Sequence, residues 1–316
     1  MRLFAAERFI VGFIILLFLI DTALIAAKGI RVDYVGYLVC VLAGAGVFVL
    51  GQFYRISARD LRIASALIAG GLFILFTLAA SVFNYAILPL SFPAIDQALI
   101  GADAMLGYNW AGFVEWAATY PWIGGALFAV YATSLPQILV IIIVLGFSGK
   151  DHQLQHFLLT GVMGASASIL FWMFFPTFGA PAYQDLPAWI AGTIPIALDM
   201  TYAREVARLA TEGVEFISPR NVLGLISFPS FHTFIAAMCV WFVPRHAVMM
   251  AVILVLNILM LPAVLVQGGH HLSDIFGGLI AFAIICPTSG KLLAWLSARE
   301  RNGALEAAPT EVVAAE

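Results

Sequence analysis

Two histidines in the C-terminal half of the chain stand in surroundings that suit group transfer. His232 lies in the stretch SFPSFHT, and His270 lies in GGHHLSD, 38 positions later. Asp274 follows His270 by four positions, so on a helix the two side chains share one face. A carboxylate there accepts the proton of one ring nitrogen and leaves the other nitrogen free to attack an electrophile.

The residues around His232 suit the other half of a phosphoryl transfer. An imidazole donates protons readily near neutral pH, so His232 is a candidate general acid for the departing oxygen. Ser230 precedes it at an expected helix N-terminus, where a hydroxyl and exposed N–H groups can hold a phosphate oxygen. The alternative for both histidines is a structural role at helix ends. Their pairing favours chemistry, because ionisable groups in apolar surroundings are costly and tend to be functional.

The segment between the two histidines explains how they would meet. It is mostly apolar and is broken at Pro244, Arg245 and His246. As a helical hairpin, each leg of about 18 residues climbs about 27 Å, close to the hydrocarbon core of a bilayer. We therefore expect His232 and His270 at the same membrane face, with their rings within about 10 Å of each other.

The composition indicates that the rest of the chain is embedded in a membrane. Of 316 residues, 63% are hydrophobic and only 10% are charged. This predicts an all-α, polytopic integral membrane helix bundle with about eight transmembrane helices. The expected spans cover 9–27, 35–53, 63–87, 121–148, 157–175, 229–244, 247–266 and 275–297. The net charge of −3 argues against a nucleic-acid partner, and the three cysteines fit neither a disulfide framework nor a zinc site.

Two segments between the spans are expected to be more than connectors. The stretch with Asp96 and Asp103 has glycines and aromatic residues that favour an interfacial helix or a re-entrant segment on the outer face. Residues 199–213 predict an amphipathic helix, capped at Asp199 and stopped by Gly213, that lies on the membrane surface or at the mouth of a site. We expect a single domain over 1–300, with a catalytic core at about 157–297, and a disordered cytoplasmic tail over 301–316.

The distribution of basic residues predicts the orientation of the bundle. With a cytoplasmic N-terminus, ten of the 15 lysines and arginines lie inside and five lie outside, as the positive-inside rule requires. The five outer residues are Lys28, Arg31, Arg204, Arg208 and Arg220. The histidines then face the extracytoplasmic side, and we expect a bacterial inner-membrane protein with its site facing the periplasm.

The two histidine motifs resemble a known family. PSFHT and GGHHLSD are similar to the second and third signature motifs of the type 2 phosphatidic acid phosphatase superfamily. The longer frame, with FFPTFGAPAY, resembles its inositolphosphotransferase and inositol phosphorylceramide synthase branch over most of 65–297. The resemblance implies a phosphohistidine intermediate with His270 as nucleophile, Asp274 as its partner, His232 as acid and Ser230 in the phosphate cradle. It implies no metal and no cofactor.

The chain departs from the family pattern in its basic residues. The KxxxxxxRP motif is absent, and Ala263 and Val264 stand where many members carry a Ser-Arg pair. A phosphate ester needs cationic donors in its transition state. We therefore expect at least one of Arg204, Arg208 and Arg220 to point toward His270, the alternative being ordinary solvated side chains.

Two functions share this chemistry, and a third is the alternative to both. A lipid phosphatase would pass the phosphoryl group from a membrane lipid phosphate or pyrophosphate to water. A lipid phosphotransferase would pass it to the hydroxyl of a second lipid or a polyol. The third possibility is a catalytically silent transporter or scaffold. Among the other polar residues, we expect His271 to line the site, Asn257 and Gln267 to make helix–helix hydrogen bonds, and Asp21 to be either functional or structural.

Overall fold

The computed structural model describes residues 3–306, and within them the fold is an all-α membrane bundle of twelve α-helices. The one β pairing joins β1 (Arg31–Val32) in parallel to β2 (Phe216–Ile217). Six helices are long and apolar enough to cross a membrane. The predicted fold class is therefore confirmed.

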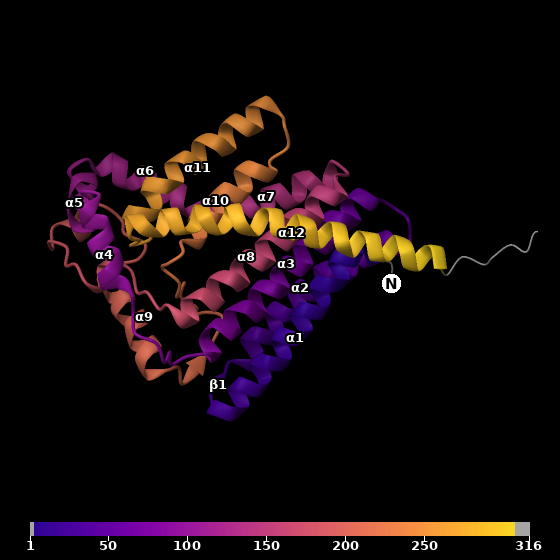
Figure 1. The fold of residues 1–316 in the computed structure, drawn as a ribbon, viewed down its shortest axis with the longest axis horizontal. Coiled ribbons are helices and arrows are strands. Elements are labelled where there is room, and N and C mark those ends of the chain that lie inside the picture. The colour runs from indigo at the N-terminus through magenta and orange to yellow at the C-terminus, as the bar shows by residue number, and fades with distance from the viewer. Residues whose placement is uncertain (1–2, 307–316) are drawn as a thin grey trace, which may run out of the picture.

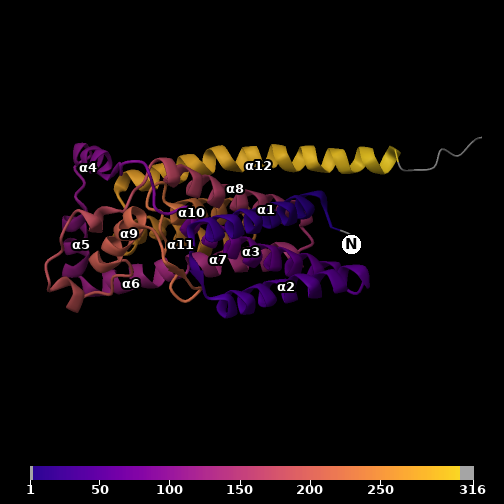
Figure 2. The same cartoon turned by 90° about the horizontal axis from the view of Figure 1, so that it is seen from below.

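The first three expected spans match three long helices that lie side by side (Figures 1 and 2). They are α1 (Ala5–Lys28), α2 (Tyr34–Ile56) and α3 (Leu61–Ala86). Aspartates begin two of them: Asp33 accepts the N–H of Gly36 at the start of α2, and Asp60 does the same for two N–H groups of α3. Such caps satisfy donors that a helix start leaves unpaired.

The fourth expected span, 121–148, is broken. It consists of α6 (Pro121–Ala132) and α7 (Ser134–Phe147), which meet at an angle of 43°. The fifth span is the continuous helix α8 (Asp151–Phe174). Counting the bent pair as one span gives seven helices long and apolar enough to cross, against the expected eight.

The expected span that this count leaves out is α10 (Phe231–Phe242), an apolar helix of only 12 residues. A helix of that length rises about 18 Å, well short of a hydrocarbon core of about 30 Å. Pro244 explains its early end, because a proline disfavours helical backbone in the residue before it, and Val243 is indeed extended (φ −57°, ψ 133°). The helices α11 (Ala247–Gln267) and α12 (Leu272–Glu306) complete the C-terminal part.

The remaining helices gather at one end of the bundle, opposite the N-terminus (Figure 1). They are α4 (Asp96–Met105), α5 (Trp110–Thr119), the short 3₁₀ turns η1 (Ala180–Ala182) and η2 (Ile190–Gly192), and α9 (Met200–Glu212). As expected, α9 is capped by Asp199 and ends at Gly213. At the other end, α12 runs through Glu306 into the segment expected to be a disordered tail, and residues 307–316 lie outside the described residues.

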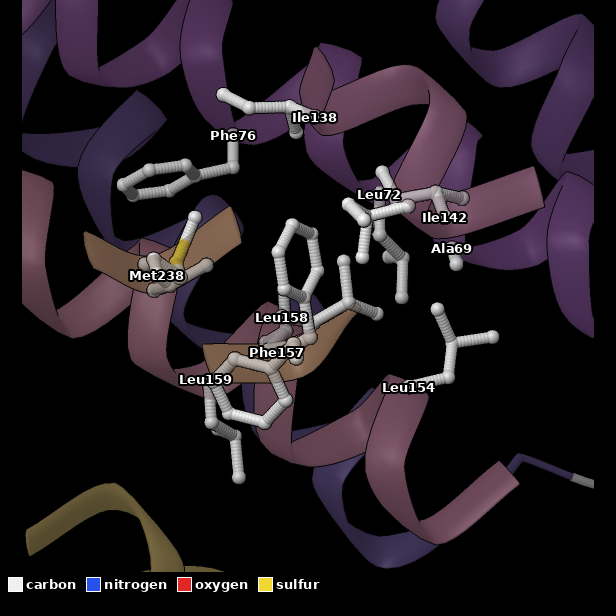
Figure 3. Packing of buried hydrophobic residues seen from close by; sticks show 14 of the residues in the cluster. Ala69, Leu72, Phe76, Ile138, Ile142, Leu154, Phe157, Leu158, Leu159 and Met238 are labelled. Carbon is white, nitrogen blue, oxygen red and sulfur yellow. The ribbon is translucent and has the colours of Figure 1, made fainter. Parts of the chain in front are cut away.

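Apolar side chains from three other helices pack against α10 (Figure 3). Met238 of α10 packs among side chains of α3, α7 and α8. These include Ala69, Leu72, Phe76, Ile138, Ile142, Leu154, Phe157, Leu158 and Leu159. The short helix is thus fixed by close van der Waals packing against long neighbours.

Candidate active site

The two histidines meet as the spacing predicts. His232 lies in the first turn of α10, and His270 lies in the turn between α11 and α12. Their ring centroids are 6.4 Å apart, and the rings are inclined by 69°. On its other side, the His232 ring stacks on Tyr131 of α6 at 4.5 Å. The bend after α6 thus helps to place an aromatic wall beside His232.

Asp274 holds His270 in one orientation. Its Oδ2 lies 2.8 Å from Nδ1 of His270, and both side chains are almost completely buried. The same oxygen accepts hydrogen bonds from the Ser227 hydroxyl at 2.6 Å and from the N–H of His271 at 3.1 Å. Because Oδ2 is an acceptor, this network assigns the His270 proton to Nδ1 and leaves a lone pair on Nε2. Ser227 was not singled out in the sequence, although it opens the same SFPSFHT stretch.

Ser230 caps α10 as predicted. Its hydroxyl accepts the N–H of Thr233 at 3.3 Å, and its own N–H donates to the Asp274 carbonyl at 3.1 Å. The cap therefore links the start of the His232 helix directly to the residue that orients His270. Its role in holding phosphate stays a prediction.

The turn that carries His270 is shaped by a glycine. Gly269 has φ +61°, a left-handed conformation that favours glycine. A Cβ at this position would lie 2.5 Å from Cγ of Pro181, so a larger residue would also collide with the neighbouring loop. The Gly269 carbonyl accepts the N–H of Ala180 at 2.9 Å. The FFPTFGAPAY stretch thus supports the histidine turn from outside the helices.

A second carboxylate network surrounds His271, and it was missed in the sequence. Nε2 of His271 lies 3.2 Å from Oδ1 of Asp96, and Nδ1 lies 3.7 Å from Oδ2 of Asp103. The two aspartates begin and nearly end α4, and their side chains are buried. A signal was available, because the seven-residue spacing places them on one face of a helix.

These contacts change the protonation of His271. Burial by itself would lower the pKa of this imidazole, but the hydrogen bond with Asp96 and the charges of Asp274, Asp96 and Asp103 raise it above its ordinary value. The three carboxylates thus favour the charged form of His271, one residue from His270.

Two of the expected phosphate ligands point elsewhere. Arg208 pairs with Glu205 at 2.7 Å and with Glu212 at 3.0 Å on the exposed face of α9. Arg204 pairs with Asp185 at 3.4 Å, and both side chains are largely exposed. The expected orientation toward His270 is therefore wrong for Arg204 and Arg208, because nearby surface carboxylates attract them instead.

Arg220 is also exposed and lies near Asp33. The N–H of Gly36, the hydroxyl of Ser218 and the charge of Arg220 hold the pKa of Asp33 below its usual range. Within residues 3–306, no hydrogen bond or ion pair joins Arg220 to His270. The structure thus places Arg220 at the start of α2 rather than in the histidine site.

Three other polar residues were singled out in the sequence, and the structure shows the surroundings of each. Asn257 donates to Oε1 of Gln137 at 2.6 Å, which confirms a helix–helix hydrogen bond between α11 and α7. Gln267 of α11 donates to the Gly124 carbonyl of α6 at 3.4 Å, which is also a helix–helix hydrogen bond. It binds the loop before α9 as well, donating to the Pro195 carbonyl at 3.0 Å and accepting the N–H of Ala197 at 3.0 Å. Asp21 is buried in α1, and its oxygens have no hydrogen-bond partner among the described residues.

Comparison with known proteins gives one match. A family model described as the PAP2 superfamily, the type 2 phosphatidic acid phosphatases, matches residues 97–287. No curated protein and no solved structure matches the chain. The matched range covers more than half of the sequence and includes both histidine motifs. The chain belongs to the PAP2 superfamily.

Proposed function

We propose that the protein transfers the phosphoryl group of a membrane lipid phosphate or pyrophosphate through a phosphohistidine on His270. The observation that carries the proposal is the pairing of His270 Nδ1 with Asp274 at 2.8 Å, opposite the His232 ring. PAP2 membership supports phosphatase or phosphotransferase chemistry in general. The long apolar helices support a substrate that reaches the site from the membrane.

The reaction follows from the free nitrogens of the two rings. In the first step, Nε2 of His270 forms a bond to phosphorus while the bond from phosphorus to the lipid oxygen breaks. His232 gives its proton to that oxygen. Within the described residues the His232 ring makes no hydrogen bond, so its nitrogens are available to substrate. Asp274 stabilises the positive charge that develops on His270.

In the second step, an acceptor oxygen attacks phosphorus, and the bond to His270 breaks. His232 takes the acceptor proton, which restores both rings to their starting state. Water as acceptor gives a phosphatase, and another hydroxyl gives a phosphotransferase. The phosphotransferase is favoured because the basic family motifs are absent and because the longer frame resembles inositolphosphotransferases.

In this proposal, no arginine stabilises the negative charge of the phosphate. His271, whose pKa the neighbouring carboxylates raise, follows His270 in the chain, and α10 begins beside the histidine pair, where a helix start offers backbone N–H groups. Together they would stabilise the charge that builds up in the transition state. The census of basic residues favours a site on the extracytoplasmic face.

The direct test combines trapping with product analysis. Purified protein is mixed with lipid phosphates that differ in headgroup, with and without candidate lipid and polyol acceptors, and the products are separated by mass. We expect a phosphoryl group on His270 after rapid acid-free quenching, and either inorganic phosphate or a phosphorylated acceptor among the products. Turnover without phosphate on His270 would refute the covalent mechanism. Absence of turnover on every lipid phosphate would favour a silent transporter or scaffold.

A further inference from the structure

A groove separate from the histidine pair runs along α10 and α11. It encloses about 890 Å³, within the range of ligand-binding cavities. Its apolar walls include Ala237 and Trp241 of α10 and Leu254 and Ile258 of α11. Trp241 and Ile258 are 66% and 56% exposed, so the wall is open to the surrounding lipid. In Figure 1, α11 diverges from α12 toward the turn that joins it to α10. We call this cavity the α10–α11 groove.

The groove carries unpaired positive charge at one end. Lys150, just before α8, and Arg245, between α10 and α11, both line it there. Within residues 3–306, neither side chain forms an ion pair or a hydrogen bond with another residue. The opposite end of the groove reaches Thr233, next to His232. The cations therefore lie at the membrane face away from the histidines.

We propose that the α10–α11 groove binds an anionic glycerophospholipid of the leaflet opposite the histidines. Its phosphate lies between Lys150 and Arg245, and its acyl chains lie along the apolar walls. Unpaired lysine and arginine side chains at a membrane surface attract anionic lipid headgroups, and the exposed apolar walls replace contacts that acyl chains make in the bilayer.

The bound lipid is distinct from the substrate of the histidine site. The length of α10, 12 residues or about 18 Å, separates the His232 end of the groove from its Arg245 end. A lipid whose phosphate contacts His270 cannot place the same phosphate at Arg245. The inference therefore does not depend on the reaction proposed for the histidines.

The test is native mass spectrometry of the full-length protein. Detergent-solubilised protein is mixed with equal amounts of phosphatidylglycerol and phosphatidylcholine that carry identical acyl chains. We expect wild-type protein to retain phosphatidylglycerol preferentially. The double variant Lys150→Gln/Arg245→Gln should lower that preference on the order of 10-fold, since each basic residue near the surface attracts anionic lipid separately.

Two further variants make the result specific. Lys291→Gln/Arg301→Gln removes the same charge from exposed positions of α12 outside the groove and should keep the preference. Ala237→Trp fills the groove and should reduce retention of both lipids. A preference that survives Lys150→Gln/Arg245→Gln, or that falls equally in the α12 variant, would overturn the proposal. Equal retention of both lipids by wild-type protein would overturn it as well.

Discussion

The two histidines differ in the contacts that hold them, and this difference supports different proposed roles for them. His270 is fixed by Asp274, which in turn accepts the Ser227 hydroxyl. Among the described residues, the His232 ring contacts the rings of Tyr131 and His270 and makes no hydrogen bond. A nucleophile benefits from a fixed tautomer, whereas a general acid needs a nitrogen that is open to the leaving oxygen.

Removing each histidine should therefore give different losses. His270→Ala should abolish turnover and the phosphoenzyme, because the covalent bond has no place to form. His232→Ala should lose about 10²- to 10⁴-fold on an alkyl phosphate but much less on an aryl phosphate, whose leaving group needs little protonation. Initial rates on both esters measure this. Equal losses on the two esters, or a phosphoenzyme surviving in His270→Ala, would show that the roles are misassigned.

His271 predicts a pH-dependent contribution to stability. Its folded-state pKa is raised above the ordinary value of 6.5. The stabilisation from Asp96, Asp103 and Asp274 is then fully present below that value and is lost as pH rises through the folded-state pKa. The melting temperature of wild type should therefore exceed that of His271→Gln most at acidic pH, and the difference should shrink as pH rises above about 6.5. A difference that is constant from pH 5.5 to pH 9 would contradict a protonated His271.

At the scale of elements, α4 acts as a brace for the start of α12. Asp103 accepts the N–H groups of Leu272 and Ser273 at 2.8 and 2.9 Å and the Ser273 hydroxyl at 2.6 Å. It thereby caps α12 from another helix, in the way that an N-cap residue does within one chain segment. Asp96 anchors the other end of α4 by accepting N–H groups of Phe178 and Gly179. Helix α4 thus ties the loop before α9 to the turn that carries His270.

This brace predicts the effect of removing Asp103. Asp103→Ala leaves buried donors without partners, which costs about 1–3 kcal/mol. We expect a lower melting temperature, together with a lower kcat/KM, because the start of α12 also places His270 and Asp274. Asp185→Ala is the matched control, since that carboxylate is largely exposed and Arg204 is its one ion-pair partner within residues 3–306. Loss of stability with unchanged kcat/KM would show that α4 does not position the histidine turn.

How far the sequence predicts these elements depends on the kind of signal. Long apolar stretches are sufficient for α1, α2, α3, α8 and α11, because a bilayer sets their length. They are not sufficient for α10, where a serine cap and a proline shorten the helix inside a longer apolar stretch. The four-residue spacing reveals His270 with Asp274, whereas the contacts of His271 with α4 join residues far apart in the chain. The sequence does not reveal the arginine partners, because Arg208 pairs within α9 whereas Arg204 pairs with Asp185 of the preceding loop.

At the scale of the whole molecule, the site lies at one end of the bundle. The start of α10, the start of α12 and the helices α4, α5 and α9 all lie at the end opposite the N-terminus (Figures 1 and 2). Buried aspartates and histidines are concentrated there, while Lys150 and Arg245 line the α10–α11 groove at the other end. The two ends of the bundle therefore differ. The paired histidines lie at one end, and the unpaired basic residues of the groove lie at the other.

This polarity leads to a prediction about topology. The turn between α2 and α3 contains Arg59, and it lies at the end of α2 that points away from α9, which carries Glu212. Cytoplasmic segments are enriched in lysine and arginine, so the Arg59 turn should be cytoplasmic and the Glu212 helix extracytoplasmic. Reporter fusions truncated after each position, one reporter active only in the cytoplasm and the other only outside it, should give opposite signals. A fusion in the Lys150 segment is the internal control and should match Arg59. Matching signals at Arg59 and Glu212 would contradict the arrangement of the helices. A cytoplasmic signal at Glu212 with an extracytoplasmic signal at Arg59 would keep the fold and place the histidine site in the cytoplasm.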